Sequence, residues 1–208
     1  MRPFIHINCA MSADGKIAGS ERKQVTISCK EDKDRVKGLR MKYDAILVGV
    51  GTVISDDPHL TVKGRPESEN QIRVVIDPDG RTPEDAQVVD SRAKTVIITK
   101  SDCARSWNGC DVVRCPGSGI DLGYAMSELY AMGIESILVE GGGTTIASFL
   151  KAGLFDVLTI YVGSMVIGGK DAPTPADGDG WVKEGGLGLV LKNAERLGDG
   201  LLLEYAPR

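Results

Sequence analysis

Short apolar runs alternate along this chain with longer segments of helical character. The apolar runs are rich in Val and Ile and bounded by Gly, Pro or polar residues, which is typical of buried strands. They lie at residues 4–10, 45–48, 72–77, 95–99, 111–115 and 136–140. Helical segments are expected at residues 28–42, 121–132 and 146–151. Strands that alternate with helices predict an α/β fold with a wound, mostly parallel sheet.

Several residue types mark the expected helix ends. Ser28 and Glu31 have the spacing of a capping box, which predicts a helix that runs to about Lys42. Asp121 is a suitable N-cap for the later helix, and Gly133 follows its expected end as a C-terminal glycine.

The end of the chain has a different pattern. Residues 187–192 and 201–205 are apolar runs on either side of Gly198-Asp199-Gly200, which predicts an antiparallel hairpin. An antiparallel hairpin is therefore expected beside the parallel strands. The chain shows no repeat and no long linker, so residues 1–208 are expected to form a single domain.

The strand at residues 45–48 stops at Gly49-Val50-Gly51, where a short helical turn is expected to begin. Backbone N–H groups at such a turn suit an anionic or polar ligand. Asp56 and Asp57 then precede Pro58. These two carboxylates are candidates for ligand contact, although Asp-Pro pairs are also common turn formers. The sequence leaves both interpretations open.

A second strand, at residues 136–140, ends at a glycine run that leads into a helix. The run is Gly141-Gly142-Gly143, followed by Thr144 and Thr145. Glycines allow close approach to the backbone, and a helix N-terminus offers free N–H donors, so this unit predicts a phosphate or pyrophosphate cradle. The standard Rossmann and P-loop motifs are absent here, and a merely flexible connection is the alternative.

Composition excludes several classes of function. The net charge of −4 gives no basic footprint for nucleic acid. The five cysteines form no C-x-x-C pair and the chain has only two histidines, so we expect neither a disulfide framework nor a metal site. No apolar segment has the length of a signal core or a membrane span, and we expect a cytoplasmic protein.

Three motifs in fixed order carry a family resemblance. They are S-x-D-G-K-x-A from Ser12, V-G-x-G-T-V-x-x-D-D-P-x-L-T from Val48, and V-E-G-G-G-T from Val139. With these motifs the chain resembles the reductases of riboflavin biosynthesis, which share a dihydrofolate-reductase-like fold, and in particular their stand-alone archaeal and fungal type. The resemblance extends to residues 73–77, 161–163 and 167–174. The deaminase signature H-x-E with P-C-x-x-C is absent, so the fused deaminase domain of some bacterial relatives is not expected.

The resemblance implies a reaction. It is the reduction of the ribosyl group of 2,5-diamino-6-ribosylamino-4(3H)-pyrimidinone 5′-phosphate to a ribitylamine, by direct hydride transfer from NADPH, or NADH, to ribose C1′. The protein would hold the two reacting carbons close together and exclude water. A reductase of the same fold that acts on the deaminated 5-amino-6-ribosylaminouracil phosphate, or on a pterin or dihydrofolate, is the alternative.

The resemblance also implies the roles of individual residues. Contacts to the dinucleotide cofactor are implied for Ala10, Thr52, Asp56, Gly141, Gly142, Gly143, Thr144 and Thr145, and the helix as far as Ser148. Contacts to the substrate are implied for Arg40, Leu60, Lys63 and Glu140, and Asp14 and Lys16 are further candidates. Glu140 is the candidate for stabilising a positively charged imine, and Arg40 for holding the phosphate.

Some positions depart from the bacterial relatives. Lys63 stands in place of an arginine, Val25 in place of a tryptophan and Pro78 in place of a serine. These departures favour the archaeal type. Lys100 and Ser101 are candidates for a 2′-phosphate contact, but the sequence does not decide between NADPH and NADH.

A binding module without activity was also considered. It has no need of a second anionic pocket, so Glu140 and Arg40 speak against it. The family resemblance implies a homodimer. The net charge and the lack of a long apolar run predict no nucleic-acid or membrane partner.

Overall fold

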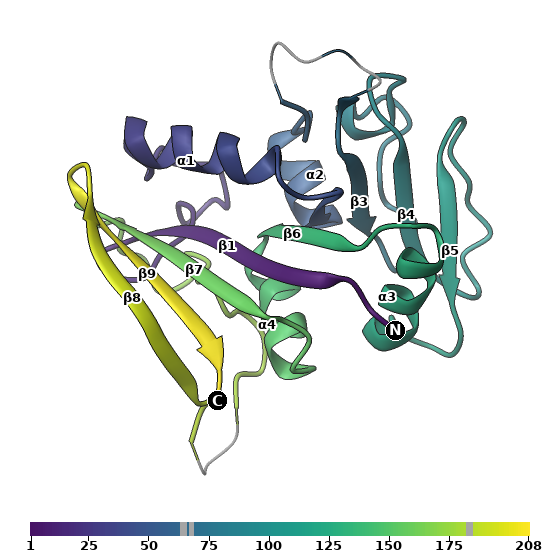
Figure 1. Cartoon of the computed structure of the whole chain (residues 1–208). Helices are drawn as coiled ribbons and strands as arrows, with labels where there is room; N and C mark the ends of the chain where they lie inside the picture. Colours follow the sequence, from purple (N-terminus) through teal and green to yellow (C-terminus); the bar gives the residue numbers. More distant parts are fainter. Residues whose placement is uncertain (63–65, 67–68, 182–184) are drawn as a thin grey trace. The chain divides into compact units, whose positions relative to one another are not determined.

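The computed structural model describes residues 1–62, 66, 69–181 and 185–208 of the chain (Figure 1). These residues divide into two compact units. The first comprises Met1–Phe4 and Leu39–Leu138, and the second comprises Ile5–Gly38 and Val139–Arg208. The predicted site residues are distributed over both units.

The first unit contains four parallel strands in the order β5-β4-β3-β2. They are β2 (Ala45–Gly49), β3 (Ile72–Ile76), β4 (Thr95–Lys100) and β5 (Asp111–Cys115). Ala45 pairs with Ile72, and Arg73 pairs with Thr95. All of β2 is buried, which explains why its sequence is continuously apolar rather than alternating.

Helices and loops of the first unit follow its strands. They include α2 (Val50–Asp56), the 3₁₀ turn η2 (Gln87–Val89) and α3 (Leu122–Ala131). Asp121 caps α3 by accepting a hydrogen bond from the backbone N of Tyr124 at 2.9 Å, and Gly133 has a φ of +85°, so both predicted helix-end signals are confirmed.

A buried arginine fixes the η2 segment to the sheet of the first unit. Arg73 on β3 is 0% exposed. Its guanidinium donates to Thr95 Oγ1, to the carbonyls of Gln87, Asp90 and Ala93, and to the Asp90 carboxylate. A buried charge is tolerated only when its hydrogen bonds are satisfied, and here each guanidinium nitrogen has at least one partner.

The second unit has strands in the order β1-β7-β9-β8. They are β1 (Phe4–Ser12), β7 (Val157–Gly163), β9 (Gly200–Pro207) and β8 (Leu189–Leu197). The β1–β7 pair is parallel, whereas β9 is antiparallel to both β7 and β8. The hairpin, yellow in Figure 1, lies along β7. The predicted α/β fold, mostly parallel with an antiparallel C-terminal hairpin, is confirmed.

Three further elements belong wholly or partly to the second unit. They are α1 (Lys30–Arg40), β6 (Ser136–Gly141) and α4 (Gly143–Lys151). The residues of β6 are shared between the two units, since Leu138 ends one and Val139 begins a segment of the other. Among the described residues, no helix combines the length and apolar character that a membrane span requires.

The start of α1 differs from the predicted capping box. The helix begins at Lys30, so Cys29 and not Ser28 occupies the N-cap position. The Cys29 sulfur accepts a hydrogen bond from the backbone N of Asp32 at 3.4 Å, and the Ser28 hydroxyl donates to the Asp32 carboxylate at 2.5 Å. The capping-box prediction was wrong because Asp32, one residue after Glu31, is the buried carboxylate that draws the Ser28 hydroxyl.

Candidate active site

Helix α2 carries two of the predicted cofactor residues in the first unit. It begins at Val50, directly after β2, because the chain turns at Gly49 and continues as a helix. Thr52 lies half-buried in its first turns, and Asp56 is its exposed last residue. Asp57 follows as the C-cap in a left-handed conformation, with φ 41° and ψ 59°.

Asp57 has its own partners within the first unit. Its Oδ1 accepts from the backbone N of Gln87 at 2.8 Å, and its carbonyl accepts from Gln87 Nε2 at 2.7 Å. Asp57 therefore ties the end of α2 to η2, which Arg73 fixes in turn. Both residues are exposed, so Asp57 differs from Asp56 in these bonds and not in burial. The bonds give Asp57 a structural role, and the contact of Asp56 with a ligand stays a prediction.

The predicted substrate residues of the first unit have different environments. Arg40 is half-buried at the end of α1. Leu60 has a φ of +50°, and its side chain is 3% exposed in the apolar core of the unit. A contact from Leu60 to a substrate would therefore come from its backbone. Lys63 lies outside the described residues.

Each unit contains non-glycine residues with a strained backbone conformation near predicted site residues. Among the described residues, the non-glycine positions with positive φ are Arg22, Asp57 and Leu60. Such conformations are sparsely populated and tend to persist at functional sites. Asp57 and Leu60 lie one and four residues after Asp56, which is consistent with the predicted place of this segment in the site.

The glycine run of the second unit joins β6 to α4 as predicted. Glu140 is half-buried near the end of β6, and Gly141 has a φ of +135°, a conformation that requires glycine. Gly142 is the N-cap of α4 and supplies no side-chain cap. The first N–H groups of a helix have no intrahelical acceptor, so this end of α4 suits an anionic group. These features fit the pyrophosphate of a dinucleotide.

Gly143 has a structural role that the sequence did not reveal. A Cβ atom at this position would lie 2.2 Å from the carbonyl oxygen of Thr174 and 2.9 Å from Cγ of Asp177. The segment 174–177 therefore packs directly on the first residue of α4. Sequence analysis related all three glycines to a ligand, whereas the close neighbour of Gly143 in this structure is the protein itself.

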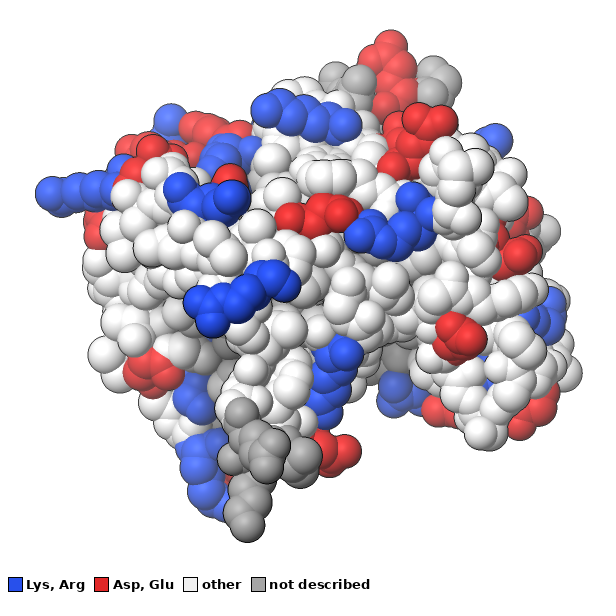
Figure 2. Space-filling view, turned by 60° about the horizontal axis from the view of Figure 1, so that its bottom comes forward, with Lys and Arg blue, Asp and Glu red and all other residues white. Residues whose placement is uncertain are grey.

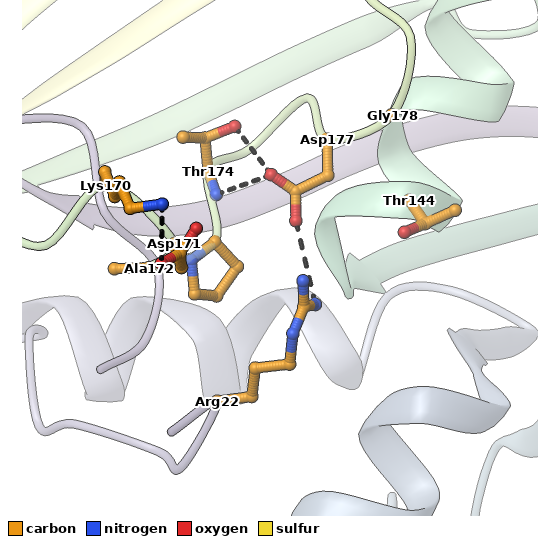
Figure 3. A pocket seen from close by; sticks show the side chains of 9 residues that line it. Arg22, Thr144, Lys170, Asp171, Ala172, Thr174, Asp177 and Gly178 are labelled. Atoms are coloured by element: carbon orange, nitrogen blue, oxygen red, sulfur yellow. Dashed lines mark hydrogen bonds and ion pairs between the residues drawn. The ribbon is translucent and has the colours of Figure 1, made fainter. Parts of the chain in front are cut away.

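A pocket of about 430 Å³ opens beside this contact (Figure 3). Within the second unit it is lined by the start of α4 and by two loops. The lining residues are Arg22, Thr144, Lys170, Asp171, Ala172, Pro173, Thr174, Asp177 and Gly178. Sequence analysis named Thr144 but assigned no role to Arg22, Thr174 or Asp177. The only available signal was the family-like segment 167–174, which carried no residue-level prediction.

Asp14 and Lys16 connect the two loops that bound this pocket. Asp14 accepts hydrogen bonds from the Ser12 hydroxyl and from the backbone N atoms of Ile167 and Gly168. The Ser12 bond, followed by that of Ile167, lowers the pKa of Asp14 to about 2. Lys16 Nζ donates to the carbonyl of Ala172 at 3.1 Å. Both side chains thus organise the wall of the pocket, and their predicted contact with substrate stays a prediction.

The remaining predicted residues have ordinary surroundings. Ala10 is half-buried on β1, opposite Tyr161 of β7. In the first unit, Lys100 pairs with Asp79 at 2.5 Å, and the Ser101 hydroxyl donates to the Gly117 carbonyl at 3.1 Å. On the face shown in Figure 2, the described acidic and basic side chains are interspersed, with no continuous basic surface.

Comparisons with known proteins add to this geometry. The profile of the family described as "RibD C-terminal domain" matches residues 3–203. Two similar proteins are each named 2,5-diamino-6-ribosylamino-4(3H)-pyrimidinone 5′-phosphate reductase. The one from Archaeoglobus fulgidus is 37% identical over 96% of each chain, and the one from Methanothermobacter thermautotrophicus is 38% identical over 99% of this chain and 98% of the relative.

Solved structures share the fold. A Thermotoga maritima protein described as a diaminohydroxyphosphoribosylaminopyrimidine deaminase/5-amino-6-(5-phosphoribosylamino)uracil reductase has a TM-score of 0.83 and 28% identity. The match covers 100% of this chain and 57% of that one. The Saccharomyces riboflavin biosynthesis reductase Rib7 has a TM-score of 0.80 at 21% identity, which supports the fold alone.

Proposed function

Because the chain belongs to the family of the RibD C-terminal domain, we propose that it reduces the ribosyl group of 2,5-diamino-6-ribosylamino-4(3H)-pyrimidinone 5′-phosphate to the ribitylamino product. The chain is an oxidoreductase of riboflavin biosynthesis, as the sequence motifs predicted. One observation carries the proposal. Two archaeal proteins with this activity in their names match the chain at 37% and 38% identity over nearly the whole length of both partners.

The choice of substrate rests on this match in length. The Thermotoga protein combines a deaminase with a reductase, and this chain spans 57% of it. The archaeal relatives, by contrast, have the length of this chain and are named for the diamino compound. We therefore place the diamino compound first, and its deaminated counterpart is the alternative substrate.

A reductase of this family uses a nicotinamide cofactor, and we propose NADPH. When bound, the cofactor supplies the hydride for ribose C1′. The glycine run and the uncapped start of α4 fit its pyrophosphate, because they offer N–H donors at the positive end of a helix dipole. Thr52 and Asp56 offer a hydroxyl and a carboxylate for its ribose hydroxyls or carboxamide.

The chain's own groups would contribute mainly through positioning. We assign the substrate phosphate to Arg40, whose guanidinium can bind it with two parallel hydrogen bonds. Glu140 would accept hydrogen bonds from ring amino groups and stabilise positive charge on the opened imine. Holding two reactants in alignment accounts for a large part of the barrier reduction in such reactions.

Initial rates of nicotinamide absorbance decay test the proposal. The purified protein is supplied with NADPH and, in turn, with the diamino substrate, its deaminated counterpart and dihydrofolate. The diamino substrate should give the highest kcat/KM. A higher value with the deaminated compound would favour the alternative, and a higher value with dihydrofolate would overturn the proposed substrate class.

We also propose that the protein is a homodimer, as the family resemblance implies. Light scattering coupled to size-exclusion chromatography should give the mass of two chains. A monomer mass that does not change with concentration would contradict this part of the proposal.

A further inference from the structure

We propose that segment 174–178, here called the strap, covers part of the dinucleotide-binding site at the start of α4 and is displaced when the cofactor binds. We further infer that Arg22 then exchanges the Asp177 carboxylate for a phosphate of the ligand. This inference rests on the proposed function, because it takes the glycine run at 141–143 as the seat of the dinucleotide. Figure 3 shows the arrangement within the second unit.

The strap approaches the start of α4 closely. A Cβ on Gly143 would lie 2.2 Å from the Thr174 carbonyl oxygen and 3.0 Å from Asp177 Oδ2. Little room is left at this residue for a second group. A ligand phosphate seated on the first turn of α4 would therefore have to move the strap aside.

The strap also places a negative charge at the start of α4. The Asp177 carboxylate lies beside the N-terminal residue of α4, where the helix dipole favours an anion. A phosphate at the same place would be repelled by this carboxylate. Asp177 thus occupies the position of the anion that the cofactor would bring.

The contacts that hold the strap differ from those of the residues before it. Lys16 Nζ and the backbone N of Ile17 donate to the carbonyls of Ala172 and Pro173, at 3.1 and 2.9 Å, so the chain is fixed just before the strap. Asp177 Oδ1 accepts from the backbone N and the hydroxyl of Thr174, at 2.9 and 3.0 Å, which gives the strap its internal shape. Asp177 Oδ2 faces Arg22 Nη1 at 3.9 Å. This pair is long and the Arg22 side chain is 68% exposed, so it is weak and can exchange partners.

Arg22 itself has a strained backbone conformation. Its φ of +60° is unusual for a residue with a side chain. A tight turn maintains this conformation, with hydrogen bonds from Arg22 N to the Gly19 carbonyl and from Gly19 N to the Lys23 carbonyl. The turn aims the guanidinium at the pocket, as Figure 3 shows. Such strain is typical of residues held for binding.

Opposite effects of two substitutions test the proposal. Asp177→Asn removes the competing charge but keeps an oxygen that can accept from Thr174. It should lower the Kd for NADPH about two- to fivefold. Arg22→Gln removes the group that would bind the phosphate, and it should raise this Kd about two- to fivefold. Both constants are measured by calorimetric titration of the whole protein, with a melting curve of each variant.

Asp34→Asn is the matched control, because Asp34 carries the same charge in the second unit but is not among the residues that line the pocket. It pairs with Lys30 at 3.2 Å, and both side chains are largely exposed. Its Kd should stay close to that of the wild type. If Arg22 and Asp177 form only a structural ion pair, their substitutions will shift the Kd in the same direction or not at all, and either result overturns the inference.

Hydrogen exchange gives a readout that does not depend on activity. The amide of Thr174 is bonded to Asp177, so saturating NADPH should make it exchange faster while amides in β7 and α4 are slowed. Slower exchange at Thr174 would show that the strap closes over the ligand, and it would contradict displacement. A wild-type protein that fails to bind NADPH would refute the proposed function, whereas same-direction effects in a protein that binds it refute the strap alone.

Discussion

Adjacent carboxylates at the end of α2 have separate roles in this account. Both are exposed, but Asp57 binds Gln87 through its side chain and its carbonyl, whereas we assign the Asp56 carboxylate to the cofactor. Asp56→Ala should therefore weaken NADPH binding by about 1–3 kcal/mol, the range for a ligand hydrogen bond left unmade, with little change in melting temperature. Calorimetric titration and a melt of the apoprotein measure the two quantities.

Asp57→Ala is the matched variant, and it should behave in the opposite way. It leaves the Gln87 amide without its acceptor, so the melting temperature should fall while the intrinsic affinity for the cofactor is kept. If Asp57→Ala abolishes binding and Asp56→Ala does not, the assignment of the ligand-facing carboxylate is wrong.

Glu140 is the residue that we assign to the substrate and its imine. Glu140→Gln keeps the size of the side chain and removes its charge, so turnover should fall much more than the affinity for NADPH. Steady-state rates and dinucleotide titration separate the two effects. Equal losses in turnover and cofactor affinity would show that Glu140 contacts the cofactor and not only the substrate.

At the scale of single residues, the sequence predicted those that lie in ordered motifs. It missed those whose role depends on contacts with distant parts of the chain. Thr144 follows a glycine run and was predicted, whereas Arg22 and Asp177 meet only because two loops far apart in sequence approach each other. Cys29 was missed as a cap because sulfur is a weak acceptor and Ser28 next to it is a usual one.

At the scale of elements, a buried polar network joins β1, β7 and α1 within the second unit. The Thr159 hydroxyl donates to Asn8 Oδ1, and Arg35 donates to the same oxygen. Since Thr159 gives its hydrogen to Asn8, it accepts from His6 Nε2 at 2.9 Å. Arg35 in turn pairs with Asp32 at 2.7 Å. The network explains why β1, which is otherwise mostly apolar, carries His6 and Asn8 on one face.

This network makes stability depend on pH. Burial, with a smaller effect from Arg35, lowers the pKa of His6 from 6.5 to about 4. The unfolded chain therefore binds a proton between these pH values that the folded chain does not. The free energy of unfolding is therefore highest above pH 6.5, where His6 is neutral in both states. It falls by about 3 kcal/mol as the pH drops from 6.5 to about 4.

Urea unfolding of the wild type and of His6→Gln over this pH range measures the effect. Glutamine can still donate to Thr159 but does not titrate, so the difference in unfolding free energy between the two proteins should change between pH 6.5 and 4. A difference that is constant across this range would show that His6 is already protonated in the folded protein.

Most strands were predictable, and β2 shows the physical reason. A parallel strand buried on both faces is apolar throughout, so β2 extends only one residue beyond its predicted bounds. β5 has its predicted bounds although it is an edge strand with exposed charged residues, whereas β7 was not predicted. The hairpin followed from its Gly-Asp-Gly turn. The pocket could not be predicted, because its walls are loops whose positions depend on contacts such as Asp14 with Gly168.

At the scale of the whole molecule, the family profile spans both compact units, since it matches residues 3–203. We therefore assign the activity to the chain as a whole, with residues of each unit in the proposed roles. The single domain over residues 1–208 stays a prediction. The fold and the reaction class followed from ordered motifs, whereas the strap emerged only from the packed structure.

The most direct test of the account follows the hydrogen that reaches the sugar. The protein is incubated with the diamino substrate and with NADPH deuterated at both C4 positions of the nicotinamide, and the product is examined by NMR. The account predicts a ribitylamine that carries deuterium at C1′. A product without deuterium at C1′, or no ribityl product at all, would contradict direct reduction of the ribosyl group by this protein.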